Sequence, residues 1–149
     1  MEAIATYKKH EGGLDIDAQE KRPRVLVVED DIAFGPIWSY ILAKANRNAI
    51  LDWSMSVFEA DEKISTLKDE GCKYDLVISD IFLTGPRTGI DLWQRYHEKF
   101  DENILLVSGI DSSKMMKFFK GYDVPRYLQK PLDVPNAILT VNEFLRRRP

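Results

Sequence analysis

Short, continuously apolar runs recur along the chain from residue 23 onward, and polar or charged residues follow them. Such runs are typical of parallel strands, because helices cover both faces of a parallel sheet. A weaker run lies between the first two strong ones. We therefore predict five strands, at about 25–28, 49–51, 76–78, 104–107 and 127–128.

The stretches between these runs carry apolar residues every three or four positions, as the buried face of a helix requires. Local signals mark several helix starts: Ser56 with Glu59 forms a candidate capping box, Asp31 is a candidate N-cap, and Asp133 comes before Val134 and a proline. Strands and helices thus alternate five times, which predicts an α/β fold with a doubly wound, five-stranded parallel sheet. Such sheets bind ligands beyond the carboxyl ends of their strands.

Composition limits the classes of protein to which the chain can belong. Its 149 residues, 44% of them hydrophobic, suit one domain, predicted at 23–149 behind a flexible polar leader at 1–22. The net charge of −3 argues against a nucleic-acid partner, and no apolar run suits a membrane span or a signal peptide. Cys72 is the single cysteine, so no internal disulfide can form. We expect a cytoplasmic protein.

Charged and hydroxyl side chains gather at the predicted strand ends. Glu29 and Asp30 follow the first strand, Asp80 ends the third, Ser108 ends the fourth and Lys130 follows the fifth. Carboxylates brought together at one edge repel one another unless a cation offsets their charge, and an all-oxygen ligand set suits Mg²⁺. An ammonium and a hydroxyl beside such a site suit a phosphoryl group, for which one carboxylate could be the nucleophile.

Four segments at these strand ends resemble the receiver domain of two-component response regulators. They are Val-Leu-Val-Val-Glu-Asp-Asp at 25–31, Asp-Leu-Val-Ile-Ser-Asp at 75–80, Leu-Leu-Val-Ser-Gly at 105–109 and Tyr-Leu-Gln-Lys-Pro at 127–131. The resemblance covers about residues 23–147. It implies a (βα)5 flavodoxin-like fold, also called CheY-like, with strand order 2-1-3-4-5.

The resemblance also implies a role for each matching residue in the phosphoryl and metal site. Asp80 would accept the phosphoryl group, and Lys130 would pair with its oxygens. Glu29 and Asp30 would hold Mg²⁺ together with Asp80, with Asp30 as a direct ligand. Phe82, two positions after the acceptor, would offer its backbone carbonyl to the metal.

Two further matches concern the switch that follows phosphorylation. Ser108 would donate a hydrogen bond to the phosphoryl group, and Tyr127 matches an aromatic residue whose orientation tracks activation. The chain departs from the family pattern at 81–89, where Gly89 falls nine positions after Asp80 instead of eight. This spacing indicates one inserted residue, with Pro86 in a shifted place.

The resemblance implies a signalling module that catalyses only its own phosphorylation and dephosphorylation. A sensor histidine kinase or a histidine phosphotransferase would be the donor. The last predicted helix ends near Pro149, so we expect a stand-alone receiver that binds a downstream protein through residues 111–148, and a homodimer is left open. Alternatives are a receiver fragment of a larger regulator or hybrid kinase, and a pseudo-receiver that switches without phosphate.

Other proteins of similar fold fit the sequence less well. Phosphatases of the haloacid dehalogenase type need a second aspartate two residues after the first, where this chain has Phe82. A flavin mononucleotide site would need a hydroxyl- and glycine-rich loop after the first strand, and the acidic residues found there would repel phosphate. The glycine pattern of a dinucleotide-binding fold is absent from the sequence.

Overall fold

The computed structural model describes residues 22–147 and contains the predicted five-stranded parallel sheet. The strands lie in the order β2-β1-β3-β4-β5, which confirms the predicted order. They are β1 (Arg24–Val28), β2 (Ile50–Ser54), β3 (Leu76–Asp80), β4 (Ile104–Ser108) and β5 (Tyr127–Gln129).

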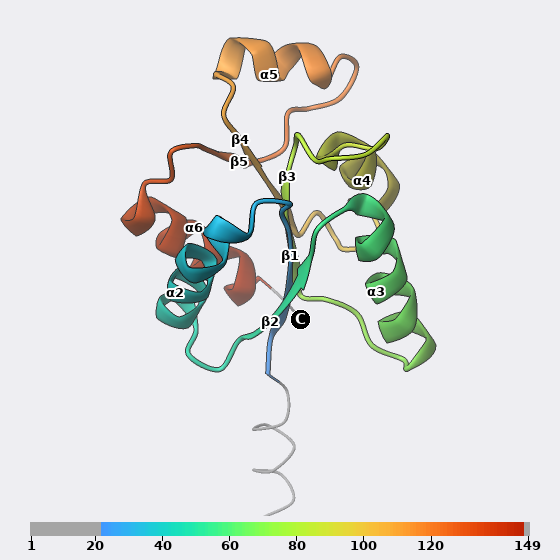
Figure 1. Ribbon diagram of the computed structural model, residues 1–149, viewed down its shortest axis with the longest axis vertical. Coiled ribbons are helices and arrows are strands. Elements are labelled where there is room, and N and C mark those ends of the chain that lie inside the picture. Colours follow the sequence, from blue (N-terminus) through green and yellow to red (C-terminus); the bar gives the residue numbers. More distant parts are fainter. Residues whose placement is uncertain (1–21, 148–149) are drawn as a thin grey trace, which may run out of the picture.

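Helices cover both faces of this sheet (Figure 1). α2 (Gly35–Ala45) and α6 (Val134–Arg146) pack on one face, and α3 (Val57–Asp69) and α4 (Gly89–Tyr96) cover the other. α5 (Ser112–Phe118) lies beyond the carboxyl ends of the strands. A short 3₁₀ turn, η1 (Ile32–Phe34), comes directly before α2.

Two apolar clusters, one on each face, hold the helices to the sheet. Alternate residues of a strand point to opposite faces, so Val27 lies in one cluster with Trp38 of α2, whereas Val28 lies in the other with Ala60 of α3. The central strands β1, β3 and β4 are buried on both faces, and this is why their sequences are continuously apolar. The packing fixes the strand ends relative to one another.

The predicted helix starts hold with two corrections. Asp133 caps α6 as predicted, but Asp31 caps η1, through the N–H of Ala33, and not α2, whose N-cap Phe34 makes no side-chain cap bond. Ser56 caps α3, but Glu59 accepts a hydrogen bond from the N–H of Met55 and not from Ser56, so the capping box is incomplete. The weak second strand extends to Ser54, three residues beyond its apolar run.

The leader predicted at 1–22 lies outside the described residues except for Arg22. Within residues 22–147, none of the helices combines the length and the apolar character that a membrane crossing requires.

Candidate functional site

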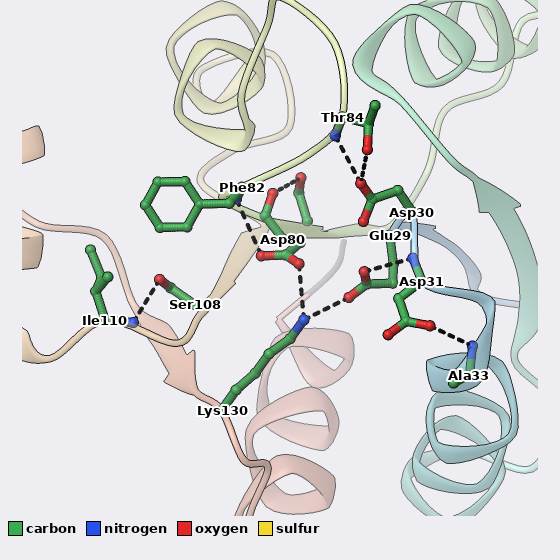
Figure 2. Close-up of polar contacts among 11 residues, drawn as sticks. Glu29, Asp30, Asp31, Ala33, Asp80, Phe82, Thr84, Ser108, Ile110 and Lys130 are labelled. Atoms are coloured by element: carbon green, nitrogen blue, oxygen red, sulfur yellow. Dashed lines mark hydrogen bonds and ion pairs between the residues drawn. The ribbon is translucent and has the colours of Figure 1, made fainter.

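Three carboxylates meet at the carboxyl edge of the sheet (Figure 2). β1 and β3 are parallel neighbours, with Val28 opposite Ser79, so the residues after β1 lie beside the end of β3. Glu29, Asp30 and Asp80 each offer an oxygen, and these oxygens lie within 4.8 Å of one another. The donor set is compact and made only of oxygen, which fits a hard divalent cation.

Lys130 joins two of these carboxylates. Its Nζ donates to Glu29 Oε1 and to Asp80 Oδ2, both at 2.9 Å, and it lies 4.0 Å from the centre of the Phe34 ring. β5 ends one residue before Lys130, and the bond from Lys130 to Pro131 is cis. The predicted meeting of an ammonium with the carboxylates is therefore observed.

Burial and ion pairing set the protonation of this group. Burial raises the pKa of Glu29, and the hydrogen bond from Lys130 only partly offsets that effect. Burial acts to lower the pKa of Lys130, but the hydrogen bonds and charges of Asp80 and Glu29 raise it above the usual value. Lys130 is thus a cation at neutral pH, and it stabilises negative charge on its partners.

Asp30 is held in a different environment from Glu29. A hydrogen bond from the Thr84 hydroxyl is the largest cause that lowers the pKa of the Asp30 carboxyl. The N–H of Thr84 also donates to Asp30 Oδ2, at 2.8 Å. Asp30 is therefore ionised at neutral pH, as a metal ligand must be.

Asp80 is buried, and its carboxylate is oriented from two sides. Lys130 binds Oδ2, and the N–H of Phe82 donates to Oδ1 at 3.3 Å. The Phe82 ring is half exposed and makes an edge contact with Phe118 of α5, with ring centres 5.9 Å apart. The predicted metal contact of the Phe82 carbonyl stays a prediction.

Ser108 and Tyr127 do not join the charged cluster. Ser108 is fully buried, and its hydroxyl accepts a hydrogen bond of 3.1 Å from the N–H of Ile110 (Figure 2). Tyr127 is partly buried and pairs in register with Leu106. It packs against the apolar cluster on the face of the sheet that α3 and α4 cover. Their roles in a switch stay predictions.

The loop at 81–89 is anchored at points that the sequence did not reveal. Thr84 binds Asp30, and Arg87 donates to Asp61 of α3 at 2.8 Å. Asp61 also accepts from the Tyr96 hydroxyl at 2.7 Å. Burial, together with this bond to Asp61, raises the pKa of Tyr96 to about 12. The loop is thus tied to the carboxylate site through Thr84 and to α3 through Arg87.

Gly89, at the end of this loop, lies directly against the backbone of Asp80. Its N–H donates to the carbonyl of Ile81 at 2.8 Å, and a methyl group on Gly89 would lie 2.2 Å from the backbone oxygen of Asp80. We expect Gly89→Ala to lower the free energy of unfolding by about 2 kcal/mol, because backbone must move to relieve the overlap. Urea titration measures this loss.

Gly35→Ala is the matched control for that measurement. A methyl group on Gly35 would meet nothing within 4 Å, and Gly35 begins α2 with ordinary helical angles. Its stability should be unchanged or slightly higher, because alanine favours a helix. Equal stability of Gly89→Ala and the unmodified protein would contradict the close approach at Asp80.

Comparisons with known proteins place this geometry in context. A scan against models of protein families finds no match. A protein of Arabidopsis thaliana described as a two-component response regulator, ARR13, is 31% identical over 90 residues. That match covers 60% of this chain but 15% of the relative, so the chain spans a small part of the relative's length.

Solved structures are similar over most of the chain. A response regulator from Chloroflexus aurantiacus has a TM-score of 0.67 at 25% identity and covers 85% of this chain and 100% of its own. The receiver domain of an HD domain-containing protein from Pseudomonas fluorescens has a TM-score of 0.69 at 22% identity, over 85% of this chain and 88% of its own.

The chemotaxis response regulator CheY4 of Vibrio cholerae is another such neighbour, with a TM-score of 0.65 at 21% identity over 84% of this chain and 100% of its own. Likeness at this level of identity establishes the fold. With the strand order 2-1-3-4-5, the described chain has the CheY-like fold, and it is similar to receiver domains of two-component response regulators.

Proposed function

We propose that this chain is a cytoplasmic phosphoacceptor of a two-component pathway, with Asp80 as the acceptor. The observation that carries the proposal is Lys130, whose ammonium binds Asp80 and Glu29 at 2.9 Å while Asp30 stands beside them. The receiver fold supports a phosphoacceptor role in general. The identity of the acceptor and its dependence on a cation are the finer parts of the proposal.

Glu29, Asp30 and Asp80 would hold Mg²⁺, with the Phe82 carbonyl as a further oxygen ligand. The fit rests on the all-oxygen donor set and on the spacing of its atoms within 4.8 Å. When bound, Mg²⁺ would offset the charge of the carboxylates and of the phosphoryl oxygens. We assign the direct contacts to Asp30 and Asp80, as the resemblance to receiver domains implies.

The transfer is a displacement at phosphorus. An oxygen of Asp80 forms a bond to phosphorus while the bond from phosphorus to the donor's imidazole nitrogen breaks, and that nitrogen keeps the electron pair. Lys130 offsets charge on the phosphoryl oxygens, and its present bond to Asp80 places it for this task. The donor would be a sensor histidine kinase or a histidine phosphotransferase.

The signal would leave through residues 111–148. Ser108 would exchange its bond with Ile110 for one to the phosphoryl group, and Tyr127 would turn inward, so that phosphorylation favours one of two pre-existing states. Met116 and Phe118 of α5 are exposed, at 65% and 45%, although Met115 and Phe119 are buried. We assign these exposed apolar side chains to the surface that binds a downstream protein.

Chemical trapping of the modified residue tests this function. We expect acetyl phosphate to modify the protein, and borohydride reduction to convert the acyl phosphate to an alcohol within the peptide that contains Asp80. Peptide mass spectrometry locates the change. Modification at any other carboxylate would contradict the assignment of Asp80, because Lys130 orients only Asp80 and Glu29 among the described carboxylates.

A further inference from the structure

Thr84 donates two hydrogen bonds to the carboxylate of Asp30. Its N–H lies 2.8 Å from Asp30 Oδ2, and its hydroxyl donates to the same oxygen. Figure 2 shows the other oxygen of Asp30 on the side of Glu29 and Asp80. One edge of the carboxylate is therefore fixed by the loop, and the opposite edge faces the acidic cluster.

The path of the loop places Thr84 in this position. Gly85 follows with a φ of 110°, which turns the chain sharply just after Thr84 and is a conformation that glycine adopts without strain. Arg87, in the second half of the loop, donates a hydrogen bond to Asp61 at 2.8 Å. At the end of the loop, the N–H of Gly89 donates to the carbonyl of Ile81, where the loop begins. The contact between Thr84 and Asp30 thus belongs to a loop that further hydrogen bonds, from Arg87 and Gly89, hold in place.

A carboxylate that ligates a cation is usually held by further hydrogen bonds, because a fixed orientation avoids the loss of side-chain freedom when the cation binds. Both donors of Thr84 act on Oδ2, so they fix the rotation of the Asp30 carboxylate and turn its other oxygen toward Glu29 and Asp80. They also stabilise the ionised form that a cation requires.

We infer that Thr84 is a positioning residue that orients Asp30 toward a divalent cation and so couples cation binding to the loop at 81–89. The inference rests on the proposed function, since it concerns the same carboxylates. The loop at 81–89 then matters to the site, because it brings a hydroxyl and an N–H to Asp30, 54 residues away.

The test compares Thr84→Val, which removes only the hydroxyl at nearly constant shape, with Thr84→Ser, which keeps it. Thr66→Val is the matched control, because the Thr66 hydroxyl donates to the Glu62 carbonyl within α3, away from the site. Mg²⁺ is titrated by calorimetry into each folded protein. We expect Thr84→Val to weaken Mg²⁺ binding about tenfold, and Thr84→Ser and Thr66→Val to bind as the unmodified protein does.

A second measurement separates orientation from a merely structural role. Mg²⁺ should slow amide hydrogen exchange at residues 82–88 of the unmodified protein, and this protection should be lost in Thr84→Val. If Thr84→Val binds Mg²⁺ as tightly as the unmodified protein, or more tightly, Thr84 does not orient Asp30 and the inference is wrong while the proposed function stands. If the unmodified protein binds no Mg²⁺, both are wrong.

Discussion

Asp80→Asn should take up no phosphoryl group from acetyl phosphate, whereas the unmodified protein should take up one. The amide nitrogen and oxygen of asparagine are poor nucleophiles, so no acyl phosphate can form at this position. The substitution keeps the shape of the side chain, and Lys130 keeps its bond of 2.9 Å to Glu29. We therefore expect the variant to fold, and intact-protein mass spectrometry measures the loss of the adduct.

Asp69→Asn is the control for this experiment, because Asp69 is an exposed carboxylate at the end of α3, away from the carboxyl edge. It should be modified to the same extent as the unmodified protein. A phosphoryl adduct on Asp80→Asn at another residue would show that the acceptor lies elsewhere.

Lys130→Ala should have the largest effect on stability. The change leaves the carboxylates of Glu29 and Asp80 facing each other, and the Glu29 side chain is only 3% exposed. We expect a loss of about 3 kcal/mol in the free energy of unfolding at neutral pH, because a buried charge loses its partner. Urea titration measures this loss, with Lys120→Ala as an exposed control.

The dependence of this loss on pH and on Mg²⁺ has a definite sign. The pKa of Glu29 in the folded protein already lies above its usual value because of burial. Without Lys130 it should rise further, so acidification through that pKa adds a proton to the folded state and reduces the loss. Mg²⁺ should also reduce the loss of stability at neutral pH, because its positive charge would offset the charge of the carboxylates. A loss that is independent of both would place the effect of Lys130 in packing rather than in charge.

The strands and the charged cluster could be predicted because both follow from topology. Buried parallel strands have continuously apolar sequences, and the residues that follow them must meet at one edge of the sheet. Asp80 and Lys130, which are 50 residues apart, therefore lie within hydrogen-bonding distance as expected. Glu29 joins them through the pairing of β1 with β3.

The anchors of the loop at 81–89 could not be predicted in this way. The sequence shows that Gly89 is displaced by one position, but the turn at Gly85 decides where Thr84 points. Likewise, the bond from Arg87 to Asp61 depends on how α3 lies beside the loop, and no local pattern encodes that contact. Side chains on an irregular loop meet partners that periodicity does not specify.

We propose that the carboxylates of this site, with a divalent cation, support phosphorylation of Asp80. The most direct test of this claim is the intact mass of the unmodified protein after incubation with acetyl phosphate, with Mg²⁺ or with a chelator. We predict one phosphoryl adduct with Mg²⁺ and none with the chelator. No adduct on a folded protein that binds Mg²⁺ would contradict the claim, and so would an adduct of equal amount in the two incubations.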